Sequence, residues 1–276
     1  MHIKRWLTGI IAIPVLIVLI GANLRWPFFG VLFLARWPFY GVLFLASIAG
    51  LVEFYRMTAP GLPKAVEWSS FFITLLLFLV FALRQFLLAP AIIFLWALLP
   101  MTFYMLTHSS PDKRWTGDIS KAVSGPIYVV LPLSMLVMID IRPHGNIWIF
   151  FLLAVVFATD TGAFYFGRIF GKHKLYKAIS PNKTWEGSFG GLFSSIVVAY
   201  LFLRISGIHG FDLPVLILVI ILSLFSQVGD LAESMLKRNH GIKDSGKILP
   251  GHGGVLDRID GLLFAIPVLY IFLNWI

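Results

Sequence analysis

The feature that most constrains this chain is a succession of long apolar runs separated by short polar interruptions. A run of about 20 apolar residues matches the hydrocarbon thickness of a bilayer, where backbone polar groups must be satisfied within a helix. Apolar residues make up 59% of the 276 residues and charged residues 13%, which is more hydrocarbon than a soluble fold of this length buries. We therefore expect an all-α, polytopic integral membrane protein.

The apolar runs predict about nine spanning helices. They are expected near residues 6–21, 28–51, 69–88, 90–107, 122–140, 147–167, 187–205, 213–233 and 259–275. We expect the first run to be an uncleaved helix rather than a signal peptide, because further spans follow it directly. The break between the third and fourth runs is the weakest, and a re-entrant hairpin there would change the count.

The distribution of Lys and Arg predicts the orientation. If the N-terminus is cytoplasmic and nine spans alternate, seventeen of the 22 Lys and Arg residues fall on the cytoplasmic side and five on the other. Positive charge is enriched in cytoplasmic loops of membrane proteins. The sequence thus predicts a multi-pass protein of the inner (cytoplasmic) cell membrane, with an N-terminal region of four spans (1–120) and a C-terminal catalytic region of five (121–276).

Composition narrows the function further. The net charge of +9 follows from this loop asymmetry, and we expect no nucleic-acid partner because no soluble basic domain is present to bind one. The absence of cysteine excludes disulfides, thiolate catalysis and sulfur-ligated metals. An eleven-residue tandem repeat over 25–46 is interpreted as a local duplication without a catalytic role.

The chemically distinctive residues fall mainly in two loops that are predicted to be cytoplasmic, 168–186 and 234–258. Before the first loop, Asp160 lies inside an apolar run, where a carboxylate usually marks an ion, proton or substrate site. Ser180, Lys183 and Thr184 combine two hydroxyls and a cation on a rigid turn, 180–184, at the start of a predicted helix, which favours an anion such as phosphate. The earlier lysines of this loop, such as Lys174, are expected only to set orientation.

The second loop is bounded by paired carboxylates. Asp230 and Glu233 are three residues apart near the end of one predicted span, and Asp257 and Asp260 are three apart at the start of the next. Carboxylates that converge from two helix ends need a counter-charge, and hard oxygen ligands select Mg²⁺, which would in turn bind phosphates. Three to four of these carboxylates therefore predict a membrane-embedded, metal-assisted phosphoryl- or nucleotidyl-transfer site that faces the cytoplasm.

The residues between these pairs suit a phosphate-rich ligand. The glycine-rich segment 250–254, which includes His252, Gly253 and Gly254, permits close approach of the backbone to a ligand. Positive charge comes from four residues, Lys237, Arg238, Lys243 and Lys247. No HExxH or Cys/His pattern occurs, so a histidine-ligated zinc is not expected.

Residues 234–260 form one long pattern: Ser234-x2-Lys237-Arg238-x4-Lys243-Asp244-x4-Leu249-Pro250-Gly251-His252-Gly253-Gly254-x2-Asp257-Arg258-x-Asp260. It resembles the signature of phosphatidate cytidylyltransferases, also called CDP-diacylglycerol synthases. The resemblance extends back through Ser226-Gln227-x-Gly229-Asp230, the segment 180–187 and Asp160-Thr161, and so covers the C-terminal half. Residues 1–120 resemble the family only as hydrophobic spans.

The resemblance implies that CTP and phosphatidic acid react to give CDP-diacylglycerol and pyrophosphate, in an all-helical fold that is often a homodimer. It places the metal-binding acids on Asp230 and Asp257, supported by Asp260, and implies a monovalent cation such as K⁺ beside Mg²⁺. The expected phosphate-binding residues are Ser180, Lys183, Thr184, Lys237, Arg238 and Lys243. Asp160, Asp244, Gly253, Gly254 and Arg258 are expected to contribute to substrate binding, and His252 to bind phosphate or shape its turn.

Two other classes remain open from the residues themselves. An ion-coupled transporter would use Asp160 and the cytoplasmic cations, but it predicts inverted repeats and groups near the membrane midplane, whereas these groups cluster at one face. A CTP-dependent lipid kinase would transfer the γ-phosphate and leave CDP rather than pyrophosphate. A purely structural scaffold would not need this cluster of carboxylates and glycines.

Overall fold

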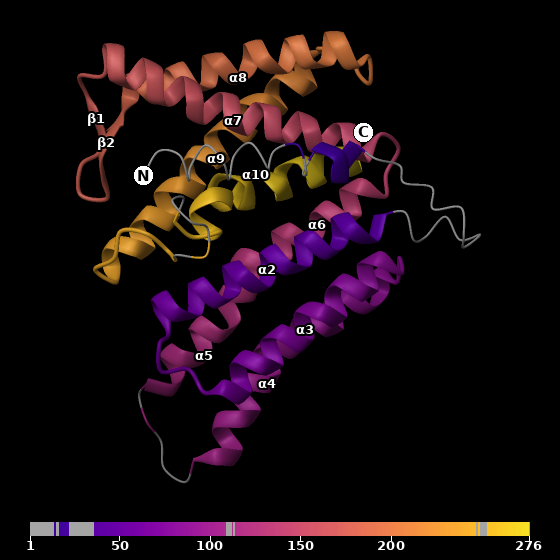
Figure 1. Ribbon diagram of the computed structural model, residues 1–276, viewed down its shortest axis with the longest axis vertical. Coiled ribbons are helices and arrows are strands. Elements are labelled where there is room, and N and C mark those ends of the chain that lie inside the picture. Colours follow the sequence, from indigo (N-terminus) through magenta and orange to yellow (C-terminus); the bar gives the residue numbers. More distant parts are fainter. Residues whose placement is uncertain are drawn as a thin grey trace. The chain divides into compact units, whose positions relative to one another are not determined.

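The computed structural model describes residues 14, 17–21, 36–108, 112, 114–246, 248 and 253–275. The helical elements, in chain order, are α2 (Trp37–Thr58), α3 (Lys64–Ala82), η2 (Phe86–Leu88), α4 (Ala89–Thr107), α5 (Arg114–Gly125), η3 (Pro126–Val130), α6 (Leu131–Asp140), α7 (Gly145–Phe170), α8 (Trp185–Ser206), α9 (Leu213–Asn239) and α10 (Leu256–Trp275) (Figure 1). Two short antiparallel strands, β1 (Lys174–Tyr176) and β2 (Ser180–Thr184), form a hairpin between α7 and α8.

Among the described residues, seven helical segments are long and apolar enough to cross a membrane. They are Trp37–Thr58, Lys64–Ala82, Phe86–Thr107, Arg114–Asp140, Gly145–Phe170, Trp185–Ser206 and Leu213–Asn239. The protein is thus an all-α, polytopic membrane protein, as its sequence predicts. The count of nine stays a prediction, because most of the first expected span lies outside the described residues. The last expected span is helical, as α10.

The chain divides into two compact units, residues 1–137 with 244–256, and residues 138–243 with 257–276. The first unit contains α2 to α5, η3 and most of α6, together with the segment 244–256. The second contains α7 to α9, the hairpin and α10 after its first residue. These units are groups of residues that pack together, whereas the expected regions 1–120 and 121–276 are consecutive stretches of chain defined by their predicted spans and function. That division stays a prediction.

In the first unit, a proline determines how α5 continues into η3. Pro126 has no N–H, so the carbonyl of Ala122 loses its usual helical donor, and the next five residues form a π-helical turn. The buried Tyr55 hydroxyl of α2 donates to this carbonyl oxygen, 2.9 Å away, and also bonds Ser70 of α3 at 3.0 Å. The Tyr55 side chain therefore satisfies this carbonyl group and joins α2 to both α5 and α3.

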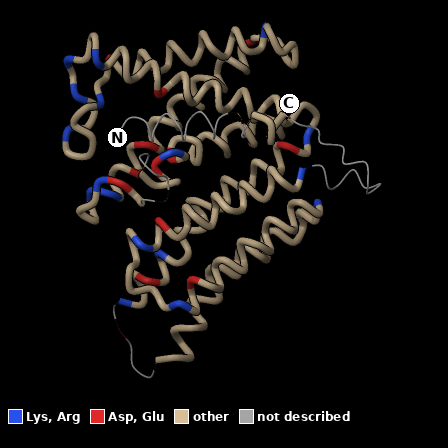
Figure 2. Tube along the Cα trace, viewed as in Figure 1, with Lys and Arg blue, Asp and Glu red and all other residues tan. Residues whose placement is uncertain are grey.

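In the second unit, α7 and α8 pack through small residues. A side chain at Gly191 would come within 2.6 Å of the carbonyl oxygen of Thr159, and one at Gly187 within 2.7 Å of that of Ala163. Small residues allow the backbones of membrane helices to approach closely and gain van der Waals contact. Most of this unit's charged residues gather at the end of these helices that bears the hairpin (Figure 2).

Two local features differ from the sequence expectation. The apolar pattern predicts the end of a span near residue 233, but α9 continues to Asn239, so Lys237 lies on the helix rather than beyond it. The segment 180–184, predicted as a rigid turn, is strand β2. Its partner strand has only three residues, which is too short to produce a recognisable alternating pattern.

Candidate active site

Two glycines bring α9 and α10 together at the predicted site. A side chain at Gly229 would come within 2.5 Å of the carbonyl oxygen of Asp260, and one at Gly261 within 2.7 Å of the Ser226 hydroxyl. At both positions the neighbouring atoms leave room for a hydrogen atom but not for a side chain. The close crossing places Asp260 near enough to Asp230 for the charge of Asp230 to act on it.

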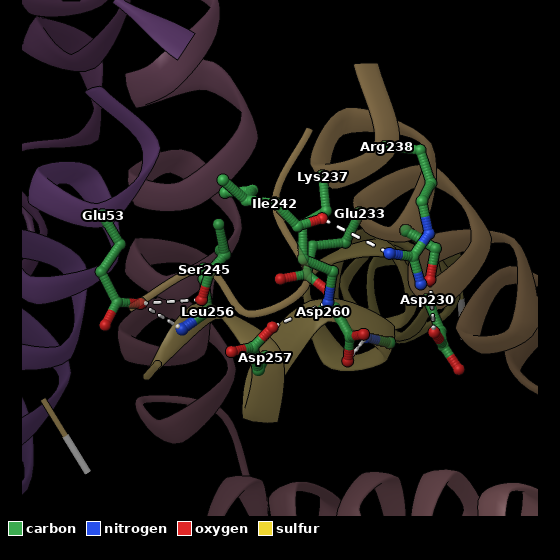
Figure 3. A network of polar contacts seen from close by, with 12 residues as sticks. Glu53, Asp230, Glu233, Lys237, Arg238, Ile242, Ser245, Leu256, Asp257 and Asp260 are labelled. Carbon is green, nitrogen blue, oxygen red and sulfur yellow. Dashed lines mark hydrogen bonds and ion pairs between the residues drawn. The ribbon is translucent and has the colours of Figure 1, made fainter. Parts of the chain in front are cut away.

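Lys237 is the central cation of the site (Figure 3). Its ammonium group lies 2.5 Å from Oε2 of Glu233, one helical turn earlier on α9, and 2.7 Å from Oδ1 of Asp257 on α10. Only 12% of the lysine side chain is exposed, against 0% for Glu233 and 10% for Asp257. Water screens such a pair weakly, so the two ion pairs fix Lys237 and Asp257 relative to each other.

The hairpin adds a second ion pair from the other predicted loop. Lys183 on β2 lies 2.6 Å from Oδ2 of Asp230, and both side chains are partly exposed. Arg238 of α9 also reaches the hairpin, where it donates to the carbonyl oxygen of Ile179 at 3.4 Å. The structure thus brings together two segments that lie about fifty residues apart in the sequence, as their residue types predict.

Thr184 and Glu186, at the end of the hairpin, form contacts that the sequence does not predict. The buried hydroxyl of Thr184 accepts from the N–H of Gly187 at 3.1 Å and so caps α8, whereas its predicted contact with phosphate stays a prediction. Glu186 was given no role of its own, yet its carboxylate accepts from the backbone N–H groups of Lys172 and His173 and lies 2.6 Å from Nδ1 of His173. A glutamate in the first turn of a helix is the signal that could have indicated this role.

Acidic side chains gather in this region of the second unit. We call Asp160, Asp230, Glu233, Asp257 and Asp260 the carboxylate cluster, because each interacts electrostatically with at least one other member. Among the residues that the structure describes, Lys183 and Lys237 form direct ion pairs with it. Carboxylates this close repel one another when ionised, and a bound cation would relieve that repulsion.

The donors in the carboxylate cluster suit a hard cation such as Mg²⁺, which prefers carboxylate, hydroxyl and water oxygens. The buried hydroxyl of Ser226, beside the Gly261 crossing, has no hydrogen-bond partner among the described residues. Within the same part of the chain, no three His, Asp or Glu side chains are grouped closely enough to hold one ion as they stand. The chemistry of the residues fits the predicted metal, and its ligand set stays a prediction.

Apart from Ser180, the remaining predicted residues lie on the segment after α9 or at the start of α10. Lys243, Asp244 and Arg258 are exposed. Gly253 has a φ of 84°, which a side chain disfavours, and Gly254 is buried. Ser180 is the first residue of β2, on the same strand as Lys183. His252, predicted to bind phosphate or shape the turn, lies outside the described residues.

Comparison with known proteins agrees with this arrangement. A model of the Cytidylyltransferase family matches residues 4–276. Phosphatidate cytidylyltransferase of Staphylococcus epidermidis is 42% identical over 176 residues, which is 64% of this chain and 68% of that protein. The enzymes of the same name from Staphylococcus saprophyticus and Staphylococcus aureus are 42% identical over 177 and 180 residues, with the same coverage of both chains. The chain therefore belongs to the cytidylyltransferase family.

Proposed function

We propose that the protein is a phosphatidate cytidylyltransferase, a nucleotidyltransferase that converts CTP and phosphatidic acid into CDP-diacylglycerol and pyrophosphate in phospholipid biosynthesis. The observation that carries this proposal is the carboxylate cluster with its two paired lysines, which is assembled from the residues that resemble the family signature. The staphylococcal relatives reported above are phosphatidate cytidylyltransferases. An all-helical membrane fold keeps a diacyl substrate in the bilayer throughout the reaction.

The reaction requires two polyanions to meet. The phosphate of phosphatidic acid attacks the α-phosphorus of CTP, the bond to the β-phosphate oxygen breaks, and pyrophosphate leaves with that bonding pair. The lipid phosphate is already an anionic nucleophile, so positioning and charge neutralisation matter more than a strong base. Lys183 and Lys237 lie where they can exchange a carboxylate partner for a phosphate oxygen, and Arg238 and Lys243 add positive charge nearby.

Asp230 and Asp257, with Asp260 beside them, are the residues that would hold Mg²⁺. Bound there, the ion would neutralise triphosphate charge and stabilise the charge that develops on the leaving group. A monovalent cation such as K⁺ and a homodimeric assembly are further parts of this proposal, and both rest on the family resemblance alone. The bacterial relatives support a location in the cell membrane, and the positive-inside asymmetry supports a cytoplasmic N-terminus and site.

The decisive experiment follows the label of CTP into lipid. Purified protein in detergent, given phosphatidic acid and Mg²⁺, should transfer label from the α-phosphate into a chloroform-soluble product and release pyrophosphate. A chelator should abolish the transfer, and added Mg²⁺ should restore it. Label that enters lipid only from the γ-phosphate would instead identify a lipid kinase, and no labelling from either position would reopen the transporter hypothesis.

The two loop lysines provide an internal test of the site. Lys183→Ala removes the ammonium that pairs with Asp230, and loss of one charge-assisted contact to phosphate should lower kcat/KM by about 10–100-fold. Lys174→Ala, in the neighbouring strand, removes an exposed lysine and should change kcat/KM less than about twofold. Initial rates at several CTP concentrations measure both. Equal losses in the two variants would contradict the distinction between site and orienting lysines.

A further inference from the structure

A buried glutamate in the N-terminal half lies against the signature segment. Glu53 is on α2, within a stretch that is otherwise largely apolar, and only 1% of the residue is exposed. Its carboxylate accepts from three donors of the segment 244–256: the N–H of Val255 at 3.0 Å, the N–H of Leu256 at 2.9 Å and the hydroxyl of Ser245 at 3.2 Å (Figure 3). A buried carboxylate with several donors is a strong and specific anchor.

The segment also has glycine where it passes the carboxylate. A side chain at Gly246 would overlap the Glu53 carboxylate, and one at Gly254 would overlap both Glu53 and the Ser245 hydroxyl. Residues near both ends of the segment therefore lie against the same side chain, that of Glu53 on α2. The close contact with Glu53 explains why position 254 of the signature is a glycine, without reference to a bound ligand.

The two backbone N–H groups that donate to Glu53 lie at the beginning of α10. The first N–H groups of a helix have no partner within it and favour a negative charge. Glu53 satisfies the N–H of Leu256, the first residue of α10, and that of Val255 just before it. Asp257, a predicted metal ligand, follows Leu256 directly in the chain. Because Glu53 fixes the backbone N–H of Leu256, it also restrains the backbone at Asp257.

We propose that Glu53 is a positioning residue for cytidylyl transfer, which holds residues 245–246 and 254–256 and so sets the backbone position from which Asp257 follows. This inference rests on the proposed function, and it assigns a role in the reaction to an N-terminal span. Glu53 does not touch substrate in this account. Its loss should therefore disturb the alignment of the reacting groups more than the affinity for lipid.

The test compares variants of the anchor with matched controls in the full-length protein. Glu53→Ala removes the acceptor, Glu53→Gln keeps its size but turns a donor toward a backbone N–H, and Gly246→Ala displaces the loop while Glu53 remains. The controls are Glu67→Gln on α3, whose carboxylate bonds the exposed Lys64, and Gly61→Ala, where an added carbon meets nothing within 4 Å.

Each variant is measured by kinetics, by amide hydrogen exchange over 244–256 and by thermal midpoint. Glu53→Ala and Gly246→Ala should lower kcat about 10²-fold, as small misplacements of reacting groups do, with the KM for phosphatidic acid unchanged. Glu53→Gln should lie between these and the wild type. Exchange at residues 253–256 should rise in all three and in neither control.

Three results would overturn the inference: wild-type exchange in Glu53→Ala, wild-type kcat in that variant, or equal losses in the controls. If Glu53→Ala does not fold, the same criteria apply to Glu53→Gln and Gly246→Ala. If the wild type forms no CDP-diacylglycerol, the proposed function fails, and hydrogen exchange still decides whether Glu53 anchors the segment.

Discussion

Replacement of Asp257 by Asn should nearly abolish formation of CDP-diacylglycerol while the protein remains folded. The substitution keeps the side chain's size and removes its charge, so the site loses a predicted metal ligand and the charge partner of Lys237. Metal stabilisation of a transition state is worth several kcal/mol, so turnover should fall by about 10³-fold or more. Lys237 retains its bond to Glu233, which should preserve the fold.

The measurement is the initial rate of lipid labelling from α-labelled CTP across a range of Mg²⁺ concentrations, with the thermal midpoint as a check on folding. Asp112→Asn is the matched control, because Asp112 is an aspartate in a surface ion pair with Arg114. It should leave both quantities close to the wild type. Near-normal activity of Asp257→Asn with Mg²⁺ would show that the metal assignment is wrong.

The sequence predicts the fold class because hydrophobic length is a local property. A run such as 187–205 needs a helix wherever it lies in the bilayer, and α8 covers it. The boundaries are harder to predict. The end of α9 extends beyond the apolar run because Glu233 and Lys237 bond one turn apart on the helix, and this ion pair supports helix where hydrophobicity no longer does.

The sequence also indicates the residues of the carboxylate cluster, because acids at helix ends and glycines beside them are unusual in an apolar chain. Residue types do not indicate which acid pairs with which lysine. Asp230 pairs with Lys183 and Asp257 with Lys237 because of a hairpin and a helix crossing that have no periodic signal. Glu53 was missed for a similar reason, since its partners lie about two hundred residues away in the sequence.

Lys237 should matter for stability as well as for activity. Lys237→Met leaves Glu233 and Asp257 without their shared ammonium group, and both are almost fully buried. Removal of one partner from a buried ion pair typically costs about 3–5 kcal/mol, because the remaining charge has poor solvation. We expect a clearly lower thermal midpoint in detergent and no detectable turnover.

A double variant separates these two effects. Glu233→Gln combined with Lys237→Met removes one of the stranded carboxylates, so it should recover part of the thermal midpoint but none of the activity. Lys64→Met is the matched control, since the exposed pair of Lys64 and Glu67 should contribute less than about 1 kcal/mol. If the double variant were no more stable than Lys237→Met, the buried charge of Glu233 would not be the source of the loss. If Lys237→Met kept its turnover, the lysine would be a structural counter-ion and not part of the phosphate site.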